Sequence, residues 1–163
     1  NLKMIEQPLG YDDLIFHSKL QEKINTPICL DESITSISRA RKAIEIGACG
    51  WINIKTSRGG GLTNALAIHD LCEIYKMPVW VGGMLESAVG QGASLALATK
   101  RNVLYPSDIF PSNRFFKEDF SEPEIKLKEG AKIFAPLCPG SGFTPKVESI
   151  RKGFIEQAQL KLE

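Results

Sequence analysis

Residues 28–33, ICLDES, contain a short apolar run, Ile28 to Leu30, that ends at a charged side chain, Asp31. Two similar runs, MIE and WINIK, end at Glu6 and Lys55. These charged residues are 25 and 24 positions apart, which suits one strand, one helix and two loops. The spacing predicts a β/α barrel or a doubly wound sheet, and in barrels the residues at the carboxyl ends of strands carry the chemistry. Two carboxylates and a lysine at neighbouring strand ends indicate a divalent-metal site beside an acid/base.

The segments around these runs complete an alternation of strands with helices. Asp12 and Asp13 offer a cap for the first helix, and the hydroxyl side chains within residues 33–36 offer one for the second. Gly47 ends the second helix, as glycine does just past a helix. The predicted elements are strand 3–8, helix 14–24, strand 28–31, helix 37–46, strand 51–55, helix 62–75, strand 78–81 and a small-residue helix 86–99. This order predicts an α/β fold with a parallel sheet and right-handed crossovers.

The pattern changes after about residue 104, where prolines become frequent. We expect residues 105–124 to be loop around a short strand at Asp108–Phe110. Residues 125–128 alternate like an exposed strand, and residues 131–135 are expected to pair back on them as a hairpin. A loop at 139–142 and a helix within 145–162, with apolar positions that include Phe154 and Ala158, complete the chain.

The composition is that of a soluble globular protein, with 163 residues, 43% hydrophobic and 24% charged. A net charge of +1 provides no electrostatic reason to expect nucleic acid or an anionic membrane as a partner. No run approaches the roughly 18 apolar residues that span a bilayer. The four cysteines contain no C-x-x-C pair, and Cys29 and Cys72 fall on apolar faces, so we predict core thiols in a reducing cytoplasm.

The chain starts at Asn1 and enters a strand almost at once. A complete eight-stranded barrel typically needs about 250 residues. We therefore expect either a small α/β domain complete in itself or one end of a longer chain.

The residue types at the three strand ends suit proton abstraction next to a carboxylate. A hard cation such as Mg²⁺ prefers oxygen ligands, which Glu6 and Asp31 supply. A third ligand is expected one strand before Glu6, upstream of Asn1. Lys55 beside such a cation can take or give a proton near neutral pH. A metal that holds both oxygens of a substrate carboxylate makes the adjacent C–H acidic by stabilising the enediolate.

Other interpretations stay open at this point. Each strand-end acid can be an ordinary loop residue or a helix cap, and Glu32 and Ser33 suit capping equally well. Gly59–Gly61 before a helix could cradle a phosphate, but it lacks the lysine and hydroxyl of a P-loop, and close packing of the loop is the favoured reading. His17 and His69 fall on helices with no partner for a catalytic triad. A non-catalytic structural piece is a further alternative.

Several motifs in a fixed order resemble successive strand ends of the enolase superfamily, in particular the o-succinylbenzoate synthase and N-acylamino-acid racemase group of its muconate-cycloisomerase-like branch. They are IEQP at 5–8, LDES at 30–33, NIK at 53–55 with GGGL at 59–62, and GGMLES at 82–87. SDI at 107–109, NRFF at 113–116, ED at 118–119 and PGSG at 139–142 extend the resemblance to nearly the whole chain.

The resemblance implies a fold that combines a capping domain with a modified (β/α)7β barrel. Residues 1–120 would be strands four to eight of a partial TIM-like barrel, and residues 121–163 a segment that returns to the cap. The early strands, with a lysine pair and a third aspartate ligand, and the cap would lie before Asn1, so this chain alone is expected to be inactive. A homo-oligomer is left open.

The resemblance also implies roles for individual residues. Glu6 and Asp31 would be the second and third Mg²⁺ ligands. Lys55 would be the sixth-strand lysine, which stabilises the enolate as a cation in synthases and is an acid/base partner in racemases. The loop residues that would shape the pocket for a small carboxylate substrate are Gly83, Met84, Glu86 and Ser87.

The implied reaction is the syn-dehydration of 2-succinyl-6-hydroxy-2,4-cyclohexadiene-1-carboxylate to o-succinylbenzoate in menaquinone biosynthesis. Racemisation of N-acylated amino acids is the nearest alternative. A dipeptide epimerase is disfavoured, because such enzymes usually carry an acid pair on the last strand, where Asp108–Phe110 has only the first acid.

Overall fold

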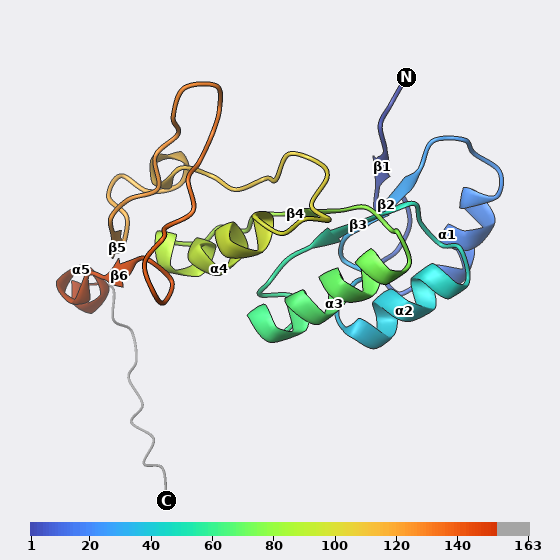
Figure 1. The fold of residues 1–163 in the computed structure, drawn as a ribbon, viewed down its shortest axis with the longest axis horizontal. Helices are drawn as coiled ribbons and strands as arrows, with labels where there is room; N and C mark the ends of the chain where they lie inside the picture. Colours follow the sequence, from blue (N-terminus) through green and yellow to red (C-terminus); the bar gives the residue numbers. More distant parts are fainter. Residues whose placement is uncertain (153–163) are drawn as a thin grey trace, which may run out of the picture.

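Four β-α units make up the first two thirds of the chain (Figure 1). The computed structural model describes residues 1–152. The elements in this part are β1 (Ile5–Glu6), α1 (Leu14–Gln21), β2 (Ile28–Leu30), α2 (Ile37–Glu45), β3 (Trp51–Ile54), α3 (Leu62–Ile74), β4 (Val79–Val81) and α4 (Ala88–Ala98). The strands form one sheet in the order β1-β2-β3-β4, and each neighbouring pair is parallel. The predicted α/β fold with a parallel sheet is confirmed.

The two faces of the sheet have opposite character. Successive side chains of a strand point to opposite faces. One face carries fully buried aliphatic residues that pack with apolar residues of the helices, namely Ile28, Leu30, Ile52, Ile54, Val79 and Val81. The other face carries Cys29 and Asp31 on or just after β2 and Asn53 and Lys55 on or just after β3. The helix-covered face therefore holds the hydrophobic core, and the polar side chains are collected on the opposite face.

Local capping explains where the first helices begin and end. The Asp13 carboxylate accepts the amide of Phe16 at 2.8 Å, so Asp13, and not Asp12, caps α1. Ser36 caps α2 in the same way, through the amide of Arg39. Gly47 follows the end of α2 with a φ of +65°, the left-handed conformation that favours glycine. Of the predicted candidates, Asp13 and Ser36 are confirmed as caps, and Gly47 is confirmed as the residue that follows α2.

The chain after α4 extends the sheet only by single bridges. Val103 pairs with Val79 and Asp108 pairs with Gly82, both parallel. The predicted strand at Asp108–Phe110 is therefore reduced to one bridging residue. The short elements that follow are the 3₁₀ turn η1 (Ser112–Arg114), the antiparallel pair β5 (Ser121–Glu122) and β6 (Thr144–Pro145), and α5 (Val147–Lys152). The part of the predicted 145–162 helix that contains Phe154 and Ala158 lies outside the described residues.

The predicted hairpin over residues 125–135 is wrong except for one pair of residues. Only Lys128 and Lys132 form an antiparallel bridge there. Ile125 is buried against α4, and its backbone carbonyl and amide bond to the Ser112 amide and hydroxyl, both at 2.9 Å. Because these groups are already bonded, they do not take part in a hairpin ladder.

The amino end of α4 is held by a residue distant in sequence. Asp119 is 1% exposed, and its carboxylate accepts the amide of Ala88 at 3.0 Å and the amide and hydroxyl of Ser121 at 3.0 and 2.6 Å. Ser87, which precedes the helix, makes no capping bond with its side chain. Asp119 therefore satisfies donors that would otherwise be buried without a partner.

We expect Asp119→Ala to lower the free energy of unfolding by about 2 kcal/mol, because it removes a cap and leaves buried donors unpaired. Urea denaturation of the protein measures this change. Glu118→Ala is the control, since Glu118 is exposed and pairs with Lys146 at the surface, and its effect should stay below about 0.5 kcal/mol. Equal effects of the two substitutions would contradict the capping role.

The cysteines are free, and three of them are buried: Cys29, Cys49 and Cys72. Burial raises the pKa of Cys29 and of Cys72 to about 12 and also raises the pKa of Cys49. These thiols therefore stay neutral and act as small core side chains, as predicted for Cys29 and Cys72. Cys138 is exposed. Within residues 1–152, no helix has both the length and the apolar character needed to cross a bilayer.

Candidate functional site

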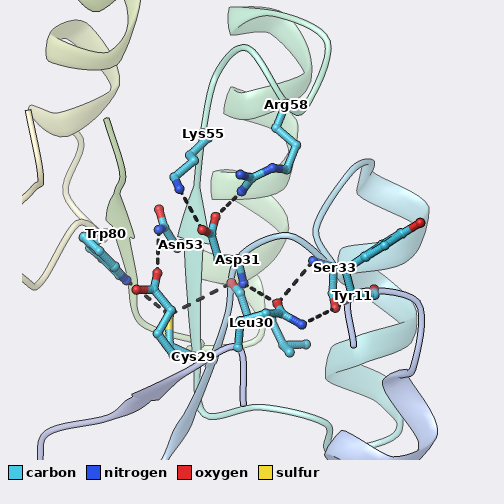
Figure 2. A network of polar contacts seen from close by, with 11 residues as sticks. Tyr11, Cys29, Leu30, Asp31, Ser33, Asn53, Lys55, Arg58 and Trp80 are labelled. Atoms are coloured by element: carbon cyan, nitrogen blue, oxygen red, sulfur yellow. Dashed lines mark hydrogen bonds and ion pairs between the residues drawn. The ribbon is translucent and has the colours of Figure 1, made fainter. Parts of the chain in front are cut away.

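Asp31 and Lys55 meet at the carboxyl edge of the sheet (Figure 2). Lys55 Nζ donates to Asp31 Oδ2 at 2.7 Å. The Asp31 side chain is 5% exposed and that of Lys55 14%. Both residues directly follow neighbouring parallel strands, β2 and β3, so the fold itself brings them to the same edge. The predicted association of a strand-end acid with a strand-end lysine is thus present in the structure.

Arg58 is a second cation on Asp31 and was not predicted. Its Nη1 bonds to Asp31 Oδ1, so both carboxylate oxygens are paired with a positive charge. The turn after β3 explains its position, because the amide of Gly59 bonds back to the carbonyl of Lys55 and places Arg58 beside the same carboxylate. The three-residue spacing from Lys55 was a usable signal. The glycines of this stretch form a more conspicuous motif than the Lys55–Arg58 spacing.

Gln7 fixes the backbone around Asp31 and was also missed as a site residue. Its Oε1 accepts the amides of Asp31 and Ser33 at 3.0 and 3.2 Å, and its Nε2 donates to the Ser33 hydroxyl at 2.9 Å. The Ser33 hydroxyl in turn donates to the carbonyl of Tyr11 at 2.7 Å. Ser33 therefore ties together the loops after β1 and β2 and does not cap α2, while Glu32 is exposed.

Glu6 lies at the edge strand β1 and faces a different partner. Its Oε1 accepts a hydrogen bond from Asn53 Nδ2 at 2.8 Å. Glu6 and Asp31 line one open pocket, which they share with Gln7, Leu9, Tyr11 and Glu32. The structure thus brings both predicted carboxylates to one pocket but bonds Lys55 to Asp31 and Glu6 to Asn53.

The glycine loop after β4 lies against this cluster. A Cβ on Gly82 would fall 2.4 Å from Asn53 Oδ1 and 2.6 Å from Lys55 Cε, and one on Gly83 would fall 2.2 Å from the carbonyl oxygen of Asp108. Glycine is therefore required at position 83, where the obstacle is backbone, and position 82 has room for a Cβ only if the Asn53 and Lys55 side chains shift. The other predicted substrate residues follow in the same loop, with Met84 exposed and Glu86 and Ser87 half-buried.

The phosphate-cradle interpretation of Gly59–Gly61 is not supported. The amides of these glycines donate to the carbonyls of Lys55, Ser57 and Thr56, so they are already occupied. Gly60 and Gly61 have φ values of +84° and +105°, and this backbone conformation accounts for glycine at both positions. The contacts around Gly59 are ordinary van der Waals contacts, so close packing is not the main reason for the motif.

The carboxylates of the predicted site do not form a three-residue metal cluster within residues 1–152. The one group of three potential ligands found there is His69, Asp70 and Glu73 on α3. Its histidine Nδ1 bonds to Asp70 at 2.8 Å. His17 bonds through Nδ1 to the carbonyl of Asp13. Both histidines thus lie on helices as predicted.

The chain matches known proteins in sequence and in fold. Residues 1–150 match the family described as Enolase C-terminal domain-like. The chain is 47% identical over 152 residues to the o-succinylbenzoate synthase of Bacillus subtilis (strain 168), covering 93% of this chain and 41% of the relative. It is 47% identical over 141 residues to the N-succinylamino acid racemase of Thermus thermophilus, covering 86% and 37%.

A solved structure shows the same arrangement of elements. The crystal structure of the dipeptide epimerase from Cytophaga hutchinsonii, complexed with Mg and the dipeptide D-Ala-L-Val, matches with a TM-score of 0.84 and 29% identity, over 93% of this chain and 41% of that one. The chain thus spans about 40% of the length of the proteins it matches. By its family match, its relatives and its fold, the chain belongs to the enolase superfamily, in the group that contains the o-succinylbenzoate synthases and N-succinylamino acid racemases.

Proposed function

We propose that the chain is the C-terminal portion of a Mg²⁺-dependent o-succinylbenzoate synthase. The observation that carries the proposal is the Lys55–Asp31 pair at two neighbouring strand ends, next to a pocket that Glu6 shares. A chain 47% identical to the Bacillus subtilis synthase has this pair at the edge of the sheet where barrel enzymes perform their chemistry. The substrate is a small carboxylate, and the reaction is its dehydration through an enediolate.

The architecture is proposed as strands four to eight of a (β/α)7β barrel. The four-stranded sheet is extended in sequence order by the bridges at Val103 and Asp108, which supports this interpretation. Residues 1–120 form the barrel portion and residues 121–163 the segment that returns to a capping domain. The cap and the early strands belong to the rest of the protein, so this portion by itself does not turn over substrate.

The residues present fit a hard divalent cation. Glu6 and Asp31 provide oxygen donors in one pocket, as Mg²⁺ prefers. Both oxygens of the Asp31 carboxylate are paired with cationic side chains, Lys55 and Arg58, so Asp31 would coordinate a cation once one of these pairs opens. Mg in the related dipeptide epimerase supports the same choice of metal. When bound, the cation supplies stabilisation of the negative charge that develops on the substrate carboxylate.

The chain's own residues provide a positive charge, hold Asp31 in place and keep space open beside Lys55. The Lys55 ammonium places a positive charge beside the pocket, where it stabilises an enolate in the synthase reaction. Gln7 and Arg58 hold Asp31 through its backbone amide and its carboxylate. Gly82 leaves open the space next to Lys55 that any side chain would fill. Gly83, Met84, Glu86 and Ser87 form the proposed substrate loop beside this space.

The second candidate is racemisation of N-acylated amino acids. It is favoured by the 47% identity to the Thermus thermophilus racemase, which equals the identity to the synthase. Lys55 suits both reactions, because an ammonium group can stabilise an enolate and can also return a proton to it. The proposal further places the enzyme in the cytoplasm, where the free thiols remain reduced, and leaves a homo-oligomer open.

The test is an assay of the whole protein with both substrate classes. We expect the dehydration to proceed with Mg²⁺ and to fall by at least about 100-fold when the metal is removed by a chelator, since the metal stabilises the developing charge by several kcal/mol. Readdition of Mg²⁺ should restore the rate, and this is the control for unfolding. A higher kcat/KM for N-acylamino acids would favour the racemase, and metal-independent dehydration would contradict the proposed mechanism.

A further inference from the structure

Asn53 bonds to one strand-end charge, Glu6, and lies close to a second, Lys55. It is 2% exposed on β3, two residues before Lys55 and on the same face of the strand. Its Nδ2 donates to Glu6 Oε1 at 2.8 Å across 47 residues of sequence. Figure 2 shows Asn53 beneath Lys55 and beside Asp31. One end of this carboxamide therefore already holds a proposed metal ligand.

The other end of the Asn53 carboxamide has no partner. Its Oδ1 is buried and makes no hydrogen bond within residues 1–152. A Cβ placed on Gly82 would lie 2.4 Å from this oxygen and 2.6 Å from Lys55 Cε, so the lysine side chain passes close to it. A buried amide oxygen without a donor destabilises a fold, and an apolar side chain of the same shape would avoid that cost. An asparagine here thus points to a bond made in another state of the site.

We propose that Asn53 is a positioning residue that couples Glu6 to Lys55, an inference that rests on the proposed function. Its Nδ2 holds one oxygen of Glu6 and leaves the other free for a cation. Its Oδ1 accepts a hydrogen bond from the Lys55 ammonium when Asp31 serves as a ligand. The ammonium has three donors, of which one is seen on Asp31, so it can exchange one acceptor for the other without leaving the site.

Gly82 fits the same scheme. A Cβ at this position would lie 2.4 Å from Asn53 Oδ1 and 2.6 Å from Lys55 Cε, so it would overlap both side chains where they now lie. The glycine therefore keeps open the space in which the lysine can turn toward the carboxamide.

The test uses the whole protein with Asn53→Leu, which is apolar and of similar size, and Asn53→Ser, whose hydroxyl is too short to reach both partners. Both should lower kcat by about 10- to 100-fold, as loss of a residue that orients a metal ligand does, and should weaken Mn²⁺ binding about tenfold. Mn²⁺ binding is followed by electron spin resonance. KM should change less than about threefold, because Asn53 holds ligands and lysine and not the substrate.

The matched control is Asn102→Leu. Asn102 also donates through Nδ2 at 2.8 Å, to the carbonyl of Met77 away from the site. This variant should have a lower melting temperature but the kcat and Mn²⁺ affinity of the wild type. If both Asn53 variants behave in the same way, with kcat and Mn²⁺ affinity of the wild type, Asn53 is only structural and the inference is overturned.

A different result would contradict the proposed function. If the wild-type protein has neither synthase nor racemase activity, that proposal is wrong. The Mn²⁺ titration of the variants then still decides whether Asn53 supports Glu6.

Discussion

Lys55→Ala in the whole protein should lower kcat for the dehydration by about 10³-fold, at the upper end of what loss of one preorganised group that stabilises developing negative charge costs. The substitution removes the positive charge beside the pocket and its bond to Asp31. The fold should be retained, because Lys55 follows the end of β3 and Arg58 still pairs with the remaining carboxylate. The measurement is kcat at saturating substrate and Mg²⁺, with circular dichroism and thermal unfolding alongside.

Lys100→Ala is the control for this experiment, because Lys100 is an exposed lysine just after α4 and belongs to no part of the site. It should keep wild-type kcat. A Lys55→Ala protein that folds and turns over within about threefold of wild type would remove Lys55 from the mechanism. The alternative of a non-catalytic structural portion would then gain support.

Asp31→Asn should have the largest effect on stability. The Asp31 carboxylate is 5% exposed and lies between Lys55 and Arg58, so its loss leaves two partly buried cations without a counter-charge. We expect the free energy of unfolding to fall by about 3 kcal/mol, as when one partner of a buried ion pair is removed. Mg²⁺ affinity of the whole protein should fall by more than about 100-fold, because even residues that only orient a ligand contribute 10- to 100-fold.

Glu148→Gln is the control for this experiment, because it also removes one negative charge from an ion pair, but at the surface. Glu148 pairs with Arg151 across an exposed helix face, with side chains 79% and 61% exposed, so the change should stay within about 0.5 kcal/mol. Chemical denaturation measures both variants, and calorimetric titration measures Mg²⁺. An Asp31→Asn protein that is as stable as Glu148→Gln and binds Mg²⁺ like wild type would contradict both the ion-pair interpretation and the ligand assignment.

Local rules account for the parts of the fold that were predicted well. Asp13 and Ser36 cap their helices and Gly47 ends one, because a side chain or a backbone conformation acts there on its immediate neighbours. The strands of the sheet are apolar runs bounded by these helices, so their order follows from the alternation. The hairpin at 125–135 failed because Ile125 is used by Ser112 and α4, which the alternation of its own residues does not report.

Residues that act over long distances in the sequence were missed. Asp119 caps a helix that begins 31 residues earlier, at Ala88. Asn53 bonds Glu6 across 47 residues, and Arg58 bonds Asp31 across 27. None of these pairs has a spacing that a helix or strand period would reveal. Arg58 alone had a local signal, its place one turn after Lys55.

The β-α alternation and the positions of Glu6, Asp31 and Lys55 at strand ends can be derived from the amino-acid sequence, because strand and helix periods and turn chemistry are local properties of the chain. Which of these charges meet is known from the folded structure. The parallel register between β2 and β3 brings Lys55 to Asp31, the turn after β3 adds Arg58, and Glu6 is left to Asn53. These pairings depend on how strands distant in sequence align, and the spacing along the chain does not encode that alignment.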